Sequence, residues 1–244
     1  MDHTNNLRVK LAKQIGNQQV FIDDLTLTAT AADAGCYQKV PKIVLKPTGE
    51  KQVVDSLRIL HETRTPVTFR AAGTSLSGQS ISDSVLLQAR GDQWNKYEIL
   101  DNGRYIKAQP GITGTRLNQV LAPFGVKFGP DPASINSAMV GGIVANNASG
   151  MSCGIHANSY ATIQSARIIF SDGSLLDTND LGSREAFLRS KPALISTINK
   201  LKKKIRSNTQ LVERIRENTA LRIPQDTVLI HSSILTIRWI LSCT

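Results

Sequence analysis

The residues best suited to holding a ligand form a turn of small side chains between two apolar runs: Ala71, Ala72, Gly73, Thr74, Ser75, Leu76, Ser77, Gly78, Gln79 and Ser80. Eight of these ten residues are Ala, Gly, Ser or Thr. Such a turn brings several backbone N–H groups near one point without side-chain bulk, which suits a phosphate or pyrophosphate group. The Thr and Ser hydroxyls add hydrogen-bond donors. The sequence therefore predicts an anion-binding loop, and a plain polar turn between two strands is the alternative.

Two better-known phosphate-binding loops do not fit this turn. The stretch from Gly73 reads G-x-x-x-x-G-Q-S, so Gln79 stands where the P-loop pattern has its lysine. The missing cation and the strand-like residues that follow argue against a nucleoside triphosphatase. No G-x-G-x-x-G opens a helix anywhere in the chain, which argues against a Rossmann dinucleotide site.

A second glycine-rich segment covers residues 128–154 and carries Gly129, Gly141, Gly142, Gly150 and Gly154. A surface loop of this length should carry several charges, yet Asp131 is its only charged residue. We therefore expect a buried, irregular backbone that lies directly against a ligand, with Asn146 and Asn147 supplying amides. A tightly packed helix with small faces is the alternative.

Alternating strands and helices position the two segments. A strand over residues 40–45, a helix capped around Thr48 and Glu50, and a strand over residues 67–69 form a βαβ unit. The first loop then follows the C-terminal end of a strand, where open α/β sheets bind ligands. Further on we expect a hairpin around Asn102-Gly103, a helix capped by Thr113, and a hairpin turning at Asp172-Gly173. Helical patterns cover residues 4–16 and 183–218.

The order of these motifs resembles a known family. The chain reads D-A-x-x-Y from Asp33, P-V-x-x-R-x-x-G-T-S-L-S-G from Pro66, P-G-I from Pro110, D-P-A-S and then G-G-x-x-A-N-N-A-S-G from Asp131, and S-D-G from Ser171. Over roughly residues 33–178 it resembles the FAD-binding PCMH-type flavoproteins, also called the vanillyl-alcohol oxidase type. Within them it is most similar to the D-lactate dehydrogenase and glycolate oxidase FAD-subunit branch, especially bacterial members fused to an iron–sulfur domain.

The resemblance implies an α+β fold in which FAD lies between two small α/β subdomains. It places Arg70 and residues 71–79 around the FAD pyrophosphate, and it assigns the remaining cofactor contacts to Asp131, Pro132, Ser137, Gly141, Gly142, Asn146 and Gly150. Some members attach FAD covalently through a histidine in the first loop; this loop contains none, so we expect non-covalent FAD. Cys153 and His156 follow the second segment, either near the flavin or as ordinary packing residues. No catalytic residue is assigned.

The expected domain organisation has five parts. These are a helical N-terminal extension (1–36), a first FAD subdomain with the βαβ unit and pyrophosphate loop (37–90), a second FAD subdomain with a mixed sheet (91–180), a helical segment (181–220) and a non-native tail (221–244). From Leu221 the tail shows neither helical nor strand periodicity. Codons for it, shifted by one frame, can spell N-T-T-G-Y-S-L-N-S-F-I-D-F-N-D-P-V-D-I-L, which resembles the iron–sulfur-fused members at this position. We therefore expect a frameshift near Thr219 and a truncated protein.

The resemblance also implies an activity. The family relation predicts oxidation of a D-2-hydroxy acid, such as D-lactate, glycolate or D-2-hydroxyglutarate, by hydride transfer to FAD. The electron acceptor is unknown, with a quinone or a cytochrome as candidates, and any iron–sulfur ligands belong to a missing C-terminal region. The alternatives are an inactive, truncated flavin-binding remnant and a basic nucleic-acid-binding module.

Composition narrows these alternatives. Residues 1–180 hold 17 Lys and Arg against 15 Asp and Glu, whereas the last 64 residues hold 12 against 4. The run Lys202-Lys203-Lys204 with Arg206 is either a patch that binds nucleic acid or acidic lipid, or a solvated helix face. Few aromatic residues lie nearby, so we expect that the chain binds no nucleic acid.

Because the sequence shows no signal peptide and no transmembrane run, we expect a cytoplasmic protein, with attachment to the inner membrane face as an alternative. Cys36, Cys153 and Cys243 are far apart and predict neither disulfides nor a metal site.

Overall fold

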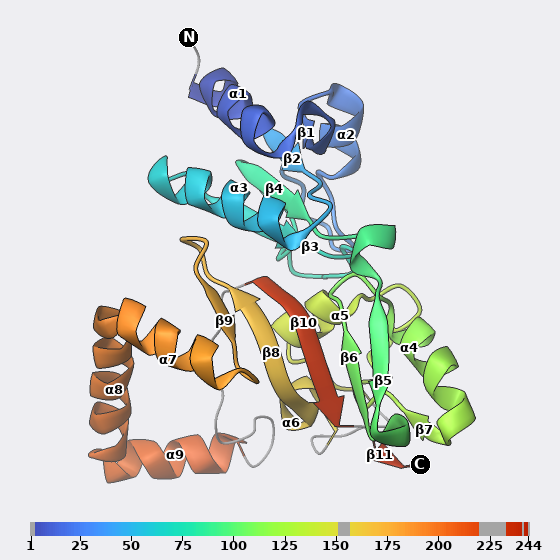
Figure 1. Cartoon of the computed structure of the whole chain (residues 1–244), viewed down its shortest axis with the longest axis vertical. Helices are drawn as coiled ribbons and strands as arrows, with labels where there is room; N and C mark the ends of the chain where they lie inside the picture. Colours follow the sequence, from blue (N-terminus) through green and yellow to red (C-terminus); the bar gives the residue numbers. More distant parts are fainter. Residues whose placement is uncertain (1–2, 151–156, 220–232, 241, 244) are drawn as a thin grey trace.

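The computed structural model describes residues 3–150, 157–219, 233–240 and 242–243. These residues form a four-stranded, a five-stranded and a two-stranded sheet, with three helices projecting to one side of the five-stranded sheet (Figure 1). The two larger sheets lie at opposite ends of the molecule's long axis. The two glycine-rich segments therefore come from different halves of the fold.

The first subdomain is built on the four-stranded sheet. Its strands stand in the order β1 (Val20–Phe21), β2 (Ile43–Leu45), β4 (Val85–Gln88) and β3 (Val67–Arg70), and only the β1–β2 pair is antiparallel. The helices are α1 (His3–Ile15), α2 (Asp24–Ala29) and α3 (Glu50–Glu62). As the apolar spacing predicts, α1 buries Leu7, Leu11 and Ile15, and they join the core of this sheet. The N-terminal residues thus form part of the subdomain, and they add its edge strand.

The second subdomain is built on the five-stranded sheet. Its order is β5 (Tyr97–Leu100), β6 (Tyr105–Ala108), β10 (Ser233–Ile240), β8 (Ile163–Ile169) and β9 (Leu175–Asp177), flanked by α4 (Gly114–Leu121), α5 (Val140–Ala145) and α6 (Ser159–Thr162). We expected a mixed sheet, but all four pairings are antiparallel. Tight hairpins connect β5 to β6 and β8 to β9, and strands joined by a tight hairpin run antiparallel. The helix α4 begins as predicted, because the Thr113 side chain accepts from the Arg116 N–H.

Strand β10 comes from a stretch that shows no strand periodicity. It lies between β6 and β8, pairing Ile237 with Ala108 on one side and with Ala166 on the other. Backbone N–H and C=O groups make these pairs, so regular side-chain alternation is not needed for a strand bonded on both sides. A short strand β11 (Ser242–Cys243) pairs with β7 (Val126–Lys127). The frameshift stays a prediction.

The helical pattern over residues 183–218 forms three helices, α7 (Leu181–Ser190), α8 (Pro192–Arg206) and α9 (Thr209–Thr219), which we call the helical arm (Figure 1). The first break falls at Lys191, which precedes a proline and is therefore disfavoured in helical conformation.

Among the described helices, none combines the length and apolarity that crossing a membrane requires. The described residues also contain no cluster of three His, Cys, Asp or Glu side chains that could hold a metal ion.

Apolar and polar contacts join the two subdomains. The Trp94 side chain is 2% exposed, belongs to the core of the first subdomain, and donates its Nε1–H to the Pro47 carbonyl at 2.6 Å. The turn between β8 and β9 packs on α3, since a Cβ on Gly173 would lie 2.6 Å from Arg58 Cγ and 3.0 Å from the Val54 carbonyl oxygen. The hairpin tip therefore sits directly on the first subdomain.

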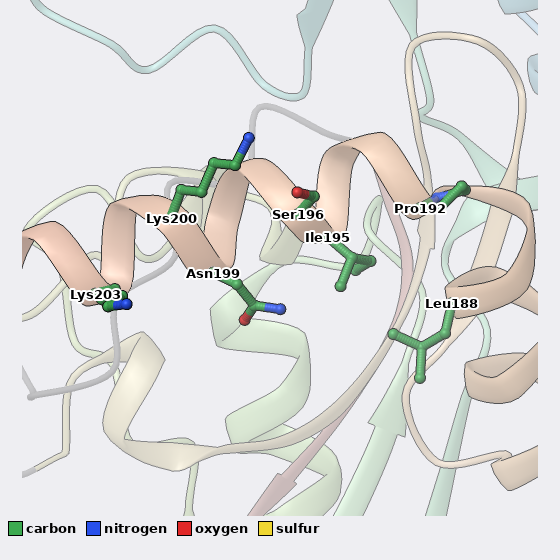
Figure 2. A pocket seen from close by; sticks show the side chains of 7 residues that line it. All are labelled: Leu188, Pro192, Ile195, Ser196, Asn199, Lys200 and Lys203. Atoms are coloured by element: carbon green, nitrogen blue, oxygen red, sulfur yellow. The ribbon is translucent and has the colours of Figure 1, made fainter.

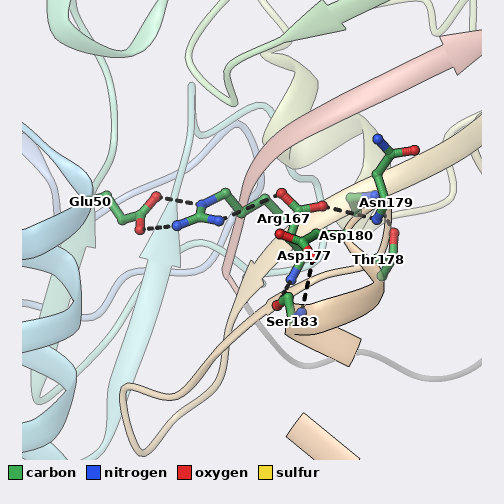
Figure 3. A network of polar contacts seen from close by, with 8 residues as sticks. Glu50, Arg167, Asp177, Thr178, Asn179, Asp180 and Ser183 are labelled. Atoms are coloured by element: carbon green, nitrogen blue, oxygen red, sulfur yellow. Dashed lines mark hydrogen bonds and ion pairs between the residues drawn. The ribbon is translucent and has the colours of Figure 1, made fainter. Parts of the chain in front are cut away.

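An ion pair reinforces the same junction (Figure 3). Arg167 on β8 donates from Nε and Nη2 to the two carboxylate oxygens of Glu50 on α3, at 2.8 and 2.7 Å. Its Nη1 lies 3.6 Å from the Asp177 carboxylate on β9. The hydrogen bond from Arg167 to Glu50 raises the pKa of Arg167. Two parallel N–H···O bonds fix direction as well as distance, so this pair orients the two subdomains.

We predict that Glu50→Gln lowers the free energy of unfolding by about 1 kcal/mol, because it removes a bidentate charged contact that is partly exposed. Urea denaturation at neutral pH measures this loss. Glu62→Gln is the matched control, since Glu62 lies on the same helix and has no ion-pair partner among the described residues. Equal stability of the two variants would contradict the role of the pair.

A second prediction concerns pH. Burial raises the pKa of Asp172, but hydrogen bonds from Lys191 and Ser174 outweigh this effect and hold the pKa well below its usual value of 3.8. A depressed pKa in the folded state stabilises the protein above pH 3.8, and this contribution is lost as the pH falls below it. Asp172→Asn should therefore destabilise by about 1 kcal/mol at pH 7. In urea titrations the difference from the wild type should shrink below about pH 4; a constant difference would contradict it.

Candidate functional site

The first loop, residues 71–80, leaves the C-terminal end of β3 and is shaped by two glycines. Gly73 has φ 79° and Gly78 has φ 70°, left-handed conformations that larger residues rarely adopt. Among the described residues, none accepts a hydrogen bond from the N–H groups of Gly73, Thr74, Ser75 or Leu76. The Ser75 hydroxyl instead accepts from the Ser77 and Gln79 N–H groups and closes the turn. The loop therefore presents a run of unused backbone donors.

Arg70 lies beneath this loop. Its Nη1 donates to the carbonyls of Ala32 at 2.9 Å, Ser80 at 3.2 Å and Thr30 at 3.4 Å. A Cβ on Gly73 would lie 2.5 Å from Nη2, so the loop closes over the guanidinium only with glycine there. Burial lowers the pKa of Arg70, and its Nε is buried without a partner among the described residues. Arg70 thus ties both ends of the loop to the preceding chain.

Residues 30–37 brace the loop from the outside. The Ala34 N–H donates to the Gly73 carbonyl at 3.1 Å, and the Ser80 hydroxyl donates to Asp33 at 3.4 Å. The Tyr37 ring lies against Gly78, where a Cβ would meet it at 3.4 Å. We did not place Asp33 or Tyr37 in the site from the sequence, since they precede the loop by about forty residues. The D-A-x-x-Y pattern was the signal that could have found them.

The second segment is part helix and part irregular. Val140–Ala145 form α5, so the helical alternative holds for its centre, and the residues on either side are turns. Val140, Ile143 and Val144 are buried in the second core, whereas Gly142 and Asn146 are exposed. Helical periodicity explains the difference, because it turns apolar residues inward and the glycine face outward. The expectation of a wholly buried, irregular backbone was wrong on this point.

The residues after α5 are held by side-chain hydrogen bonds. Asn147 adopts φ 43°, and its Oδ1 accepts from the Tyr160 N–H at 3.0 Å. The Ser159 hydroxyl donates to the Ile143 carbonyl at 3.0 Å. The oxygen of the Asn147 amide is therefore engaged within the fold. Cys153 and His156 lie outside the described residues.

The two glycine-rich segments meet at one point. A Cβ built on Gly142 would lie 3.4 Å from the Cβ of Ala71, which is an ordinary van der Waals distance, so the two segments are neighbours there. Gly141 lies closer still to Pro110, since a Cβ on Gly141 would come within 2.8 Å of the proline Cβ. Gly150 approaches the backbone of Asp131 in the same way. The first loop and α5 are therefore in contact with each other across the two subdomains.

The other predicted site residues differ in their contacts and exposure. Asp131 and Pro132 open a tight turn that closes with the Ile135 N–H donating to the Pro132 carbonyl at 2.8 Å. Ser137 is exposed, and its N–H donates to the Ser134 carbonyl at 2.9 Å. Neither Ser137 nor Asn146 forms a hydrogen bond with the first loop among the described residues. Thus the structure joins Ala71 with Gly142 and Asp131 with Gly150, and it leaves Ser137 and Asn146 exposed.

These residues fit a dinucleotide with a pyrophosphate. Unused N–H groups at Gly73, Thr74, Ser75 and Leu76 suit phosphate oxygens, which accept but do not donate. Gly142 is exposed and has no side chain, so a ligand can approach its backbone beside Ala71. A cofactor between the loops would thus contact both subdomains.

Comparison with known proteins agrees with this arrangement. The FAD binding domain family matches residues 41–179. D-2-hydroxyglutarate dehydrogenase of Haemophilus influenzae is 29% identical over 169 residues, 67% of this chain and 16% of that protein. Glycolate oxidase subunit GlcD of Escherichia coli is 31% identical over 159 residues, 63% of this chain and 31% of that protein. The chain therefore spans less than a third of the length of these relatives.

Solved structures of other proteins share the fold of this chain. A solved structure of alkyldihydroxyacetonephosphate synthase superposes with a TM-score of 0.67 at 16% identity, covering 98% of this chain and 40% of that one. The expected α+β fold with two subdomains of the PCMH type is confirmed. Since the family match covers more than half of the chain and contains both the first loop and α5, this chain belongs to the FAD binding domain family.

Proposed function

We propose that the chain binds FAD non-covalently between the first loop and α5, with the pyrophosphate on the loop. The observation that carries this proposal is the run of unused N–H donors from Gly73 to Leu76, which follows directly on the contact between Ala71 and Gly142 of the second subdomain. The exposed hydroxyl of Ser77 adds a donor at the same place. The loop has no histidine that could attach the cofactor covalently.

Electrostatics support a pyrophosphate at this loop. The Arg70 guanidinium is buried just below it, and Arg90 lies near enough to lower the Arg70 pKa further, although Asp33 opposes this. A guanidinium beneath unused N–H groups contributes positive charge that an anion on the loop would stabilise. We infer that Arg70 acts in two ways, as a fixed charge and as the clamp that holds the loop in shape.

We further propose that the whole protein is an FAD-dependent oxidoreductase that oxidises a small D-2-hydroxy acid such as D-lactate, glycolate or D-2-hydroxyglutarate. Bound FAD supplies the hydride-accepting chemistry. Support comes from the relatives, a D-2-hydroxyglutarate dehydrogenase and a glycolate oxidase subunit. This chain's residues would bind and orient the cofactor; the structure assigns none of them a catalytic role. A quinone or cytochrome acceptor belongs to the same proposal.

A visible absorbance titration tests both the proposed FAD binding and the proposed oxidation of a D-2-hydroxy acid. Added FAD should be retained on gel filtration with its band at roughly 450 nm, and D-2-hydroxy acids added without oxygen should bleach that band. Retention without bleaching would leave the chain as a flavin-binding remnant without dehydrogenase activity. Absence of retained flavin would overturn the binding proposal itself.

We predict that Gly142→Leu weakens FAD binding at least about tenfold, because a leucine side chain beside Ala71 would occupy the position proposed for the cofactor. The helix itself should not suffer, since leucine is a better helix former than glycine. Gly182→Leu in α7 is the matched control, with only the Asp180 carboxylate nearby. Calorimetric titration measures the affinities. Equal affinities of the two variants would place the cofactor elsewhere.

We also predict that neither Arg70→Ala nor Arg70→Lys retains FAD normally. Lysine keeps the charge but cannot reproduce a planar guanidinium that reaches three carbonyls at once. Both variants should therefore bind FAD at least about tenfold more weakly, whereas Arg90→Lys should bind it nearly as the wild type does. Normal affinity of Arg70→Lys would show that charge alone matters and would refute the clamp.

A further inference from the structure

Two polar groups without partners lie beneath the first loop. The Nε–H of Arg70 is buried, and no group among the described residues accepts it. Gln88 is only 4% exposed, yet within the described part of the chain its side-chain amide forms no hydrogen bond. Burying a polar group without a hydrogen bond destabilises the folded state, so such groups are rare in native proteins. Two of them in one place point to a bond between them.

The hollow between α7 and α8 differs in this respect (Figure 2). It measures about 540 Å³ and is lined by residues of both helices, among them Leu188, Ile195, Asn199 and Lys203. Its polar residues Asn199 and Lys203 are exposed, so water can satisfy them and no partner in the chain is required. Only buried polar groups require a partner within the protein.

The first sheet brings the Arg70 and Gln88 side chains together. Arg70 is the last residue of β3 and Gln88 is the last residue of β4, and the two are direct partners in the parallel ladder. Adjacent strands lie about 4.8 Å apart, and side chains in register leave the sheet on the same face. The guanidinium and the amide therefore start side by side, at the carboxyl ends of their strands.

The face that carries Gln88 is turned away from α3. Val85 and Leu87 of β4 belong to the core that α3 shares, so strand alternation sends Leu86 and Gln88 to the other side. β4 lies between β2 and β3, in the interior of the sheet. An apolar residue would fill this position without an unpaired amide, so packing alone does not explain a glutamine there.

Other acceptors near the guanidinium are already in use. Asp33 attracts Arg70, but its Oδ1 accepts from the Gly35 N–H at 2.9 Å and its Oδ2 from the Ser80 hydroxyl at 3.4 Å. The three carbonyls that Arg70 contacts all accept from Nη1. The amide oxygen of Gln88 is uncommitted, and the flexible glutamine side chain allows it to turn toward Nε.

We propose that Gln88 is a positioning residue for the first loop, whose side chain turns so that its amide oxygen accepts the Nε–H of Arg70. Nη1 alone is one point of attachment, about which the guanidinium can still tilt. A second hydrogen bond at Nε fixes the guanidinium plane beneath the loop. The effect on the cofactor rests on the proposed FAD binding, whereas the bond itself needs no cofactor.

NMR of the full chain without FAD tests the bond. The Arg70 Nε–H signal, identified by its loss in Arg70→Lys, should exchange slowly with solvent. Gln88→Leu keeps an apolar side chain of similar size but removes the acceptor, so this exchange should become at least about tenfold faster. Gln88→Glu retains an acceptor and should keep the exchange slow. Unchanged exchange in Gln88→Leu, or fast exchange in Gln88→Glu, would overturn the proposal.

Thr68→Val is the matched control for this measurement. Thr68 lies on the same face of β3, two residues before Arg70, and it pairs in register with Leu86 rather than with Gln88. Removing its hydroxyl should leave the exchange of the Arg70 Nε–H as in the wild type. Equally fast exchange in Thr68→Val and Gln88→Leu would indicate a general loosening of the sheet and would contradict a specific role of Gln88.

Calorimetric titration with FAD tests the consequence for the cofactor. Gln88→Leu should weaken FAD binding about fivefold, because the guanidinium beneath the loop loses one fixed hydrogen bond. In the Arg70→Lys background, which has no Nε–H, Gln88→Leu should cause no further loss. Equal losses in the two backgrounds would mean that Gln88 acts without Arg70, and they would overturn the positioning role.

The two measurements together separate this proposal from the proposed function. If the wild type binds no FAD while Gln88→Leu speeds the exchange of the Arg70 Nε–H, FAD binding fails and the bond is supported. If the wild type binds FAD while Gln88→Leu changes neither the exchange nor the affinity, the bond fails and FAD binding is supported.

Discussion

The close approach of Ala71 and Gly142 is the constraint on which the rest of the structure depends. Ala71 of the first subdomain and Gly142 of the second lie so near that a Cβ on Gly142 would be in van der Waals contact with the Ala71 Cβ, and the residues with unused N–H groups begin two positions after Ala71. A cofactor bound there, as proposed, would touch both halves of the fold at once. Binding therefore requires each loop to be rigid and the two subdomains to hold one relative position.

Separate interactions meet these two requirements. Rigidity of the first loop comes from Arg70, whose guanidinium joins chain segments on both sides of it, and from Asp33 and Tyr37 outside it. The relative position comes from Trp94 against Pro47, the β8–β9 hairpin on α3, and the pair between Glu50 and Arg167. None of these residues needs to contact the cofactor to matter for its affinity.

Local patterns predicted the local structure well. The β3 strand, the hairpin at Asn102-Gly103 and the Thr113 cap depend on nearby residues, and the structure contains all three. Features set by distant partners escaped prediction. β1 and β10 exist because another strand offers its backbone, and Arg70 is a clamp because Thr30 and Ala32 lie beside it. The family resemblance supplied the cofactor; spacing alone would have left an anion of unknown kind.

The most direct test of this account is an NMR titration of the isotope-labelled full chain with FAD. Binding between the subdomains predicts that the largest shifts appear at the amides of Gly73, Thr74, Ser75 and Leu76 and, together with them, at Gly142 across the junction. Shifts confined to one side of the junction, or centred on the helical arm, would contradict it.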